Sequence, residues 1–406
     1  MKVIVYEHVS GGGYVGQPIP PSVLSEGFGM LRCFVEDFKA AGHKVTVLMD
    51  SRLSKLSPPI SADCIVPVSY REDPKEYLKN IAKINDAIYI IAPETGQTLQ
   101  SFVELAEGTG KVPLNCESQA IERVADKAVF YETLQNLGVS PKTTVLTLDE
   151  DLVKVKLTIK KELCYPILLK PVDGVGCSGL SLVNEENQLD SAIAKIRAES
   201  KIGCFIAQEF IRGEAASVSL LSTGKKAIAL SLNKQNVTLA GPYEVSSYDG
   251  GAVPFDHWLK QEAFRVSQRV VEAFPGLKGY VGIDFVLTEH KVFVVDANPR
   301  LTTSYVGLRS VEGFNVAQAL LDAVLRGTLP AKSEIEGYAC FSKVETPTPT
   351  MVVYQKAAKL SSVVSPPFPL NDSPPAVSLV LGKGASLKDA NLHLEEAKKH
   401  LLNIIP

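Results

Sequence analysis

Residues 292–300, with the sequence VFVVDANPR, carry most of the information about the fold of this chain. Side chains alternate between the two faces of a strand, so Asp296 and Asn298 lie on the same face. Carboxylate and amide oxygens on a rigid strand are ligands that Mg²⁺ prefers, with phosphate oxygens completing its shell. Residues 282–287, GIDFVL, form a second apolar strand with a lone acid, Asp284. A plain hairpin with acids at its solvent end is the alternative.

The pairing of these two strands tests the metal hypothesis. Directly opposed residues in an antiparallel pair point to the same side, and a slip of one residue reverses that. A four-residue loop at 288–291 opposes Asp284 to Val295 and turns it away from Asp296. A three-residue loop, or a bulge, opposes Asp284 to Asp296. The hypothesis therefore predicts either the register of a three-residue loop, called here the odd register, or a bulge.

Size and composition indicate a globular chain of about two to three domains. Its 406 residues are 45% hydrophobic and 21% charged, with a net charge of -3 and no basic block, which argues against a nucleic-acid partner. The seven cysteines include no CxxC pair, which favours reduced thiols. No signal-peptide pattern and no run of about 18 apolar residues is present, so we expect a cytoplasmic protein without a membrane partner.

The first 115 residues alternate between strand-like and helix-like segments. This alternation predicts a mostly parallel sheet with helices on both faces, whose ligands lie beyond the carboxyl ends of the strands. Those ends carry Glu7, Asp50 and Glu94. The expected strands are 3–6, 45–49, 64–68 and 87–92, with a helix at 26–41.

The rest of the chain is mixed. Residues 120–138 predict one helix with Lys127 in its middle, and residues 246–254 predict a turn-rich loop. A proline-rich tail begins near residue 331. It is expected to end in a strand at 377–381 and a helix at 387–402.

Two further stretches have the composition of a nucleotide site. Lys170 ends an apolar strand and precedes DGVGCSGL at 173–180, where bare N–H groups can approach an anion and the lysine adds charge. This is not a Walker A loop, because the lysine precedes the glycines. Residues 208–214, QEFIRGE, lead a strand into a linker that can meet an adenine edge, with Glu214 near the ribose. A hairpin turn and an ordinary strand exit are the respective alternatives.

Taken in order, these elements resemble the ATP-grasp superfamily. The order is Lys127, Lys170, the glycine loop, EFIRGE, IDF and DANPR, and the resemblance covers residues 120–327. It implies an α/β (α+β) ATP-grasp fold with an N-terminal parallel α/β domain and a small C-terminal segment. The implied division is an N-terminal domain at 1–115, a small lobe at 116–205, a large lobe with the metal hairpin at 206–330, and a C-terminal segment at 331–406.

The resemblance also implies a role for each matching residue. ATP would lie between the two lobes with Mg²⁺, for which Mn²⁺ is expected to substitute. Many such ligases carry an arginine two residues before the first metal acid, where this chain has Gly282, so Arg300 is assigned to the acyl phosphate and joins Lys170 as catalytic. The remaining assignments are Lys127 and Lys170 at the phosphates; Gly174, Gly176, Ser178 and Gly179 in the loop over them; Glu209, Phe210 and Ile211 at adenine; Glu214 at ribose; and Asp284, Asp296 and Asn298 at the metal.

The family chemistry implied is carboxylate–amine ligation. ATP converts a carboxylate to an acyl phosphate, an amine attacks it, and ADP and phosphate leave. Catalysis then comes from charge neutralisation and positioning, so no enzyme nucleophile is required. A nucleotide sensor without turnover is one alternative, a ligase for another acid and amine is a second, and a carboxylase, for which no biotin-attachment segment is present, is a third.

Three stretches resemble a narrower group, the tyramine–glutamate ligases of methanofuran biosynthesis and their bacterial relatives. They are YEHVSGGG, SEGFGMLRCFVEDF with MDSRL, and IAPETGQ with DANPRLTTSY. The resemblance implies that the γ-carboxylate of glutamate is joined to tyramine or a related amine, and a homodimer is left open. Glu26 and Glu94 are candidates for an ammonium group, or else ordinary exposed acids. Candidates for the acid substrate's carboxylates are Arg300, Thr302, Thr303, Ser304 and Arg309.

One motif near the N-terminus is set aside. Residues 11–16, GGGYVG, match the GxGxxG dinucleotide fingerprint in form. Pro18, Pro20 and Pro21 follow at once, which argues against a helix starting there, and Asp50 lies too far along the chain. A substrate loop is the functional interpretation, and a flexible connector is the alternative.

Overall fold

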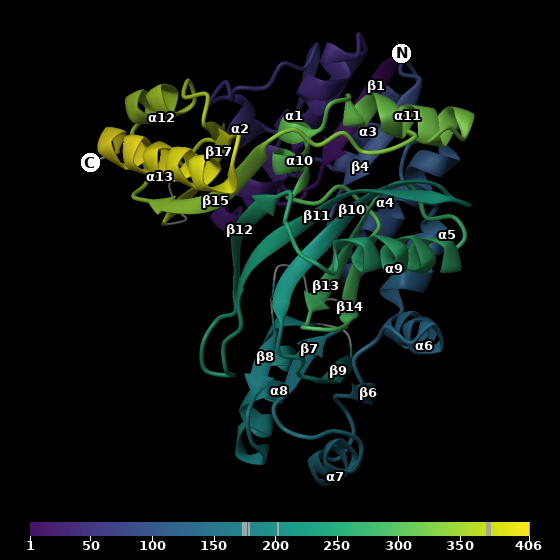
Figure 1. Cartoon of the computed structure of the whole chain (residues 1–406). Helices are drawn as coiled ribbons and strands as arrows, with labels where there is room; N and C mark the ends of the chain where they lie inside the picture. Colours follow the sequence, from purple (N-terminus) through teal and green to yellow (C-terminus); the bar gives the residue numbers. More distant parts are fainter. Residues whose placement is uncertain (173–176, 178, 201–202, 371–374, 406) are drawn as a thin grey trace.

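A computed structural model describes residues 1–172, 177, 179–200, 203–370 and 375–405 (Figure 1). Three sheets organise this part of the chain: one of five strands, one of four and one of eight. Figure 1 shows the four-stranded sheet at one end of the molecule, where the β13–β14 hairpin (Lys278–Leu287 and Val292–Asn298) reaches down to it. None of the described helices is long and apolar enough to cross a membrane.

The N-terminal domain contains the predicted parallel sheet, in the order β3-β2-β1-β4-β5. All four expected strands are present. Its strands are β1 Lys2–Glu7, β2 Lys44–Asp50, β3 Cys64–Val68, β4 Ala87–Ile91 and β5 Val112–Pro113. Its helices are α1 Pro21–Ala40, α2 Ser51–Ser54, α3 Pro74–Ala82, η1 Thr95–Gln97, α4 Thr98–Gly108 and α5 Ser118–Ala125.

The expected start of the first helix was wrong by one turn and a half. Helix α1 begins at Pro21, directly after the GGGYVG loop, and not at Glu26. A proline is tolerated in the first helical turn, because its missing N–H would have no partner within the helix there. The prolines that argued against a helix start therefore mark one.

The small lobe is an antiparallel sheet in the order β6-β9-β7-β8, covered by helices. The strands are β6 Thr143–Thr147, β7 Ile167–Pro171, β8 Ser181–Val183 and β9 Cys204–Glu209. The helices are α6 Lys127–Leu137, α7 Leu152–Glu162, η2 Glu186–Gln188 and α8 Leu189–Glu199.

The single helix expected at 120–138 is wrong. The chain forms α5 and α6, separated at Asp126, where the backbone leaves the helical region (φ -69°, ψ 99°). The Asp126 carboxylate accepts hydrogen bonds from the N–H groups of Ala128 and Val129, so it caps a new helix. Lys127 is thus the first residue of α6 and not the middle of a longer helix.

The large sheet has the order β14-β13-β10-β11-β12-β15-β17-β16. The C-terminal segment therefore extends the large-lobe sheet, through the pairing of β12 with β15. The elements of the large lobe are β10 Glu214–Thr223, β11 Ala227–Thr238, β12 Ser247–Val253, α9 Lys260–Ala273, β13, β14, α10 Tyr305–Val311 and α11 Val316–Arg326. Those of the tail are β15 Tyr338–Thr346, α12 Met351–Ala357, β16 Val363–Ser365, β17 Ala376–Gly384 and α13 Leu387–Ile404.

Residues 246–254, expected to form a turn-rich loop, form strand β12 instead. Its two central glycines suggested turns, but they are required by close backbone neighbours: Gly250 adopts φ +115° beside Phe341. The long-range partner β15, about 90 residues further on, cannot be identified from local sequence. The terminal strand and helix of the tail are confirmed as β17 and α13.

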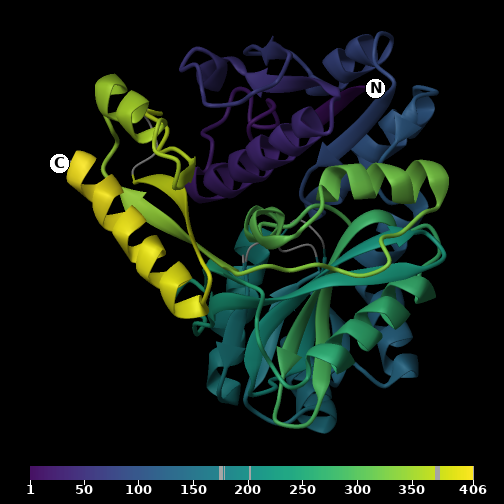
Figure 2. The same cartoon turned by 45° about the horizontal axis from the view of Figure 1, so that its top comes forward.

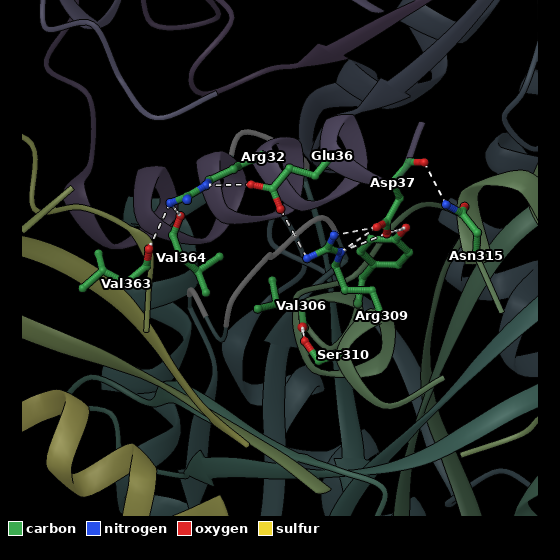
Figure 3. A network of polar contacts seen from close by, with 10 residues as sticks. Arg32, Glu36, Asp37, Val306, Arg309, Ser310, Asn315, Val363 and Val364 are labelled. Carbon is green, nitrogen blue, oxygen red and sulfur yellow. Dashed lines mark hydrogen bonds and ion pairs between the residues drawn. The ribbon is translucent and has the colours of Figure 1, made fainter. Parts of the chain in front are cut away.

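Helix α1 joins the N-terminal domain to the large lobe and to the tail (Figures 2 and 3). The Asp37 carboxylate accepts hydrogen bonds from the Arg309 guanidinium at 2.6–2.9 Å, and Arg309 also pairs with Glu36. Arg32 donates to the carbonyls of Val363 and Val364 in β16. This network fixes the relative placement of the three parts around the cleft.

Candidate active site

The hairpin β13–β14 has the bulge that the metal hypothesis requires. Leu287 pairs with Val292 across the four-residue loop. Continued without a shift, this register would oppose Asp284 to Val295. The register then shifts after Phe285, leaving Val295 as the extra residue, and Asp284 pairs with Asp296. Opposed residues share a face, so the two carboxylates lie side by side, with Asn298 two residues further on the same face. The predicted geometry is confirmed.

The bulge also provides a carbonyl for the residues beside it. The extra residue of a bulge is left out of the ladder, and Val295 O accepts from Lys170 Nζ at 3.0 Å and from Tyr131 Oη at 2.8 Å. Lys170 Nζ also donates to Tyr131 Oη at 2.7 Å. Lys127 Nζ donates to Asp296 Oδ1 at 2.7 Å. Both predicted phosphate lysines therefore meet at the end of β14 that carries the acids.

The electrostatics of the two acids differ. Burial, and then the neighbouring Asp296 charge, raise the pKa of Asp284 to about 6. Burial also acts to raise the pKa of Asp296, but the charges of Lys127 and Lys170 outweigh it, so the pKa of Asp296 is lowered. The Asp284 carboxylate accepts from Gln235 Nε2 and Asn298 Nδ2, each at 3.0 Å. Two adjacent, partly buried acids of this kind form a site suited to a cation.

This donor set fits Mg²⁺. Two carboxylates and an amide are hard oxygen ligands, and phosphate oxygens would complete the shell. Within the described ranges no group of three or more His, Cys, Asp and Glu side chains is arranged to hold a metal ion.

Arg300 is bound by Glu94. Its Nη2 donates to Glu94 Oε2 at 3.1 Å, and the two side chains are only 11% and 20% exposed. Glu94 follows β4 and Arg300 follows β14, so the pair crosses from the N-terminal domain to the large lobe. Glu94, a candidate for an ammonium group or else an ordinary exposed acid, is largely buried and pairs with the Arg300 guanidinium.

The absence of an arginine at position 282 has a steric reason. Gly282 pairs with Asn298, and a Cβ there would lie 2.5 Å from Thr302 Cγ2. A side chain at 282 would displace the loop after β14, which holds Arg300. The Thr302 hydroxyl contacts Ser304 Oγ at 2.8 Å and Tyr280 Oη at 3.2 Å, so Thr302 and Ser304 stabilise this loop.

Glu26 on α1 contacts the loop after β14 and strand β15. Its carboxylate accepts from Thr303 Oγ1 at 2.7 Å and from Lys343 Nζ at 3.0 Å. Lys343 lies on β15 and was not predicted, because its local sequence, FSKVET, is an ordinary strand. Other contributors missed from the sequence are Tyr131 and Gln235. Spacing along α6 could have indicated Tyr131, one helical turn after Lys127.

Arg309 does not belong to the cleft. Its guanidinium is held by Asp37 and Glu36 in the α1–α10 contact described above (Figure 3). The assignment of Arg309 to a substrate carboxylate is therefore corrected to a structural one. The sequence could not show this, because Asp37 lies 272 residues away.

The predicted adenine segment lies where the small lobe joins the large one. Glu209 ends β9, and Glu214 begins β10. The N–H groups of Glu209 and Phe210 donate to Lys142 O and Pro166 O. No described residue accepts a hydrogen bond from the N–H of Ile211, so this donor can meet a ligand.

Glu214 and the glycine loop complete the set of expected nucleotide residues. Glu214 is about half exposed and lies 3.7 Å from His257 and 4.0 Å from Lys234. Gly179 has φ +69° and packs on Pro171, at the end of β7 that carries Lys170. Gly174, Gly176 and Ser178 lie outside the described residues.

Comparison with known proteins supports the same fold. Residues 124–304 match the ATP-grasp domain family, and residues 43–121 match the pre-ATP-grasp 3 domain family. A putative ATP-grasp superfamily protein from Archaeoglobus fulgidus aligns with a TM-score of 0.63 at 23% identity, covering 94% of this chain and 98% of that one. Biotin carboxylase from Campylobacter jejuni, in a β-γ-ATP complex, aligns at 0.71 and 15% identity, covering 99% and 94%. The chain has the ATP-grasp fold.

Within that class the chain is similar to tyramine–L-glutamate ligases. The enzyme of Methanocaldococcus fervens is 28% identical over 310 residues, which are 76% of this chain and 89% of the relative. That of Methanocaldococcus jannaschii is 26% identical over 310 residues, 76% and 85% respectively. The resemblance inferred from the sequence is confirmed.

Proposed function

We propose that this protein, an ATP-grasp carboxylate–amine ligase, activates a carboxylate as an acyl phosphate, couples it to an amine, and releases ADP and phosphate. The acid and amine we propose are glutamate, through its γ-carboxylate, and tyramine or a related amine, as the names of the two relatives suggest. The observation that supports this best is the bulge at Val295, which opposes Asp284 to Asp296 beside Lys127 and Lys170.

The residues of the hairpin would organise the phosphates. Asp284, Asp296 and Asn298 would hold Mg²⁺, which when bound supplies charge neutralisation for phosphate oxygens, and Mn²⁺ is proposed to substitute for it. Lys170 and Lys127 add positive charge on the same side. Tyr131 keeps the Lys170 ammonium in place, so its charge is preorganised before the phosphates arrive.

Arg300 is placed to act on the carboxylate side. Glu94 fixes the guanidinium, and the fork of Arg300 can bind an oxygen of the acid or of the acyl phosphate. Adenine would lie against the link at 209–211, with Glu214 near the ribose. The two lobes would exclude water, which protects the acyl phosphate from hydrolysis.

A nucleotide sensor without turnover remains the competing function. A sensor needs the adenine link and the lysines but not two opposed acids, and here the acids are aligned by a specific bulge. That alignment favours an enzyme.

A matrix of acids and amines tests the proposal. The protein would be incubated with ATP, Mg²⁺ and each pair, ADP would be followed, and products would be identified by ³¹P NMR. We expect ADP and inorganic phosphate only where both an acid and an amine are present. Pyrophosphate would contradict the proposed chemistry, and ATP binding without turnover for every pair would favour the sensor. Replacing Mg²⁺ by Mn²⁺ in the productive pair tests the metal.

A further inference from the structure

A second ion pair, between Lys343 and Glu26, contacts the loop that follows β14 and carries Arg300. Lys343 Nζ on β15 donates to Glu26 Oε1 at 3.0 Å and to Ser22 Oγ at 2.9 Å, both on α1. The ammonium also lies 5.7 Å from the centre of the Tyr248 ring on β12. The Lys343 and Glu26 side chains are 14% and 21% exposed, so both are largely withdrawn from solvent.

The position of this pair connects it to the reacting groups. Thr303, which donates to the other oxygen of Glu26, lies three residues after Arg300 and five after Asn298. The Cys177 thiol, at the end of the glycine loop, is within the field of Asp284, Lys343 and Glu26 alike. The pair is therefore hydrogen-bonded to the loop that carries Arg300.

The chemistry of the pair matches a zwitterion. A carboxylate and an ammonium held side by side can exchange their mutual contact for the ammonium and carboxylate of an α-amino acid. A simple amine offers a cation alone and would leave Lys343 without a partner. A simple carboxylic acid would likewise leave Glu26 without one, and a buried unpaired charge is costly.

We propose that Glu26 and Lys343 bind the head group of an α-amino acid substrate, with its α-ammonium on Glu26 and its α-carboxylate on Lys343, so that its side-chain carboxylate extends toward Arg300. This inference rests on the proposed function and adds to it the residues that bind the head group of the acid. Glu26, Lys343, Ser22 and Thr303 are then specificity determinants from three different parts of the chain. The tail is part of the substrate site, through Lys343.

The structural alternative is that the pair only fastens α1 to β15. Arg32 offers a matched control, because it connects the same helix to β16 through the carbonyls of Val363 and Val364 and makes no hydrogen bond or ion pair with the described residues Glu26, Lys343 or Thr303 (Figure 3). The double variant Glu26→Lys with Lys343→Glu is a second control, since it restores an ion pair between the same elements with its polarity reversed.

The experiment compares three acids that keep the reacting carboxylate. L-Glutamate has the full head group, glutarate lacks the ammonium, and 4-aminobutyrate lacks the α-carboxylate. For wild type we expect kcat/KM for glutamate to exceed that for each analogue by about 10- to 100-fold, the range of a charged hydrogen bond. Glu26→Gln should lose the preference over glutarate, and Lys343→Met the preference over 4-aminobutyrate. Arg32→Met should retain both.

Calorimetric binding of the acids to the full chain gives a readout besides activity. The binding of glutamate should weaken in Glu26→Gln and Lys343→Met but not in Arg32→Met. The proposal is overturned if these two variants lower kcat/KM for all three acids equally, or if the double variant recovers wild-type selectivity. It is also overturned if no α-amino acid binds while another acid supports turnover. If amino acids bind through this pair and no acid–amine pair gives ADP, the proposed function fails and this inference stands.

Discussion

Asp284 shows at the level of one residue how a site can be arranged at a cost to stability. Its folded-state pKa of about 6 is above the ordinary value, so the ionised form is disfavoured in the folded chain. A group of this kind contributes stability at low pH that is lost as the pH rises through about 6. Without a cation, Asp284 and Asp296 repel each other, and the residues that assemble the site thereby weaken the empty fold.

Replacing Asp284 by asparagine should therefore separate stability from activity. Without Mg²⁺ at pH 8, Asp284→Asn should unfold at a higher urea concentration than wild type, by an amount equivalent to about 1–3 kcal/mol, because a buried like charge is removed. The difference should shrink as the pH falls from 7 to 4. Mg²⁺-dependent turnover should be lost. A variant that is less stable than wild type at pH 8 would show that the repulsion is not present.

Replacing Lys170 should lower turnover without raising the stability of the fold. Lys170→Met removes the charge held against Val295 O and Tyr131, so turnover should fall by about 100-fold or more while the fold survives. Phosphate release should fall by this factor, and the far-UV circular dichroism spectrum should remain unchanged. Lys142→Met, in the same lobe but more than half exposed, is the control and should retain activity. Unchanged turnover in Lys170→Met would remove this lysine from the site.

At the level of elements, the acidic hairpin could be predicted from sequence. The end of α5 and the strand β12 could not. Alternation of side chains and the identity of three residues required either the odd register or a bulge, and the structure has a bulge at Val295. The end of α5 at Asp126 depends on a capping interaction that competes with continued helix, and the two outcomes are close in energy. The strand β12 depends on a partner far along the chain.

The cap at Asp126, between α5 and α6, can be tested by substitution. Asp126→Ala removes the acceptor for the first N–H groups of α6, so the free energy of unfolding should fall by about 0.5–2 kcal/mol. Because Lys127 is the first residue of that helix, the KM for ATP should also rise. Asp126→Asn keeps a capping oxygen and serves as the control. If Asp126→Ala and Asp126→Asn unfold at the same urea concentration as wild type, the cap is not stabilising.

On the scale of the whole molecule, the site is assembled from residues that lie far apart along the chain. Lys127 and Lys170 contact the β13–β14 hairpin that carries Asp284, Asp296 and Asn298. The tail, in addition, joins the large sheet and places Lys343 against Glu26. Arg309, by contrast, lies in the α1 contact. Placing these residues requires the pairing of β12 with β15 and the packing of α1, both long-range, and neither follows from local pattern.

This arrangement predicts that the tail cannot be removed. A chain ending at residue 330 would expose the edge of β12 and the apolar face of α1 around Gly29, which packs against Leu379. We expect loss of soluble protein, or a melting temperature lowered by several degrees with aggregation, because an uncovered edge strand pairs with other chains. A soluble truncated chain with the wild-type melting temperature would show that the tail is an independent appendage.

The most direct test of the central claim is the fate of the carboxylate oxygen. The acid substrate, labelled with ¹⁸O in the reacting carboxylate, would be turned over with ATP, Mg²⁺ and the amine, and the phosphate would be examined by ³¹P NMR. If the residues around the Val295 bulge direct phosphoryl transfer to the carboxylate, one ¹⁸O atom must appear in inorganic phosphate for each amide formed. Unlabelled phosphate, or label in AMP, would contradict an acyl-phosphate mechanism at this site.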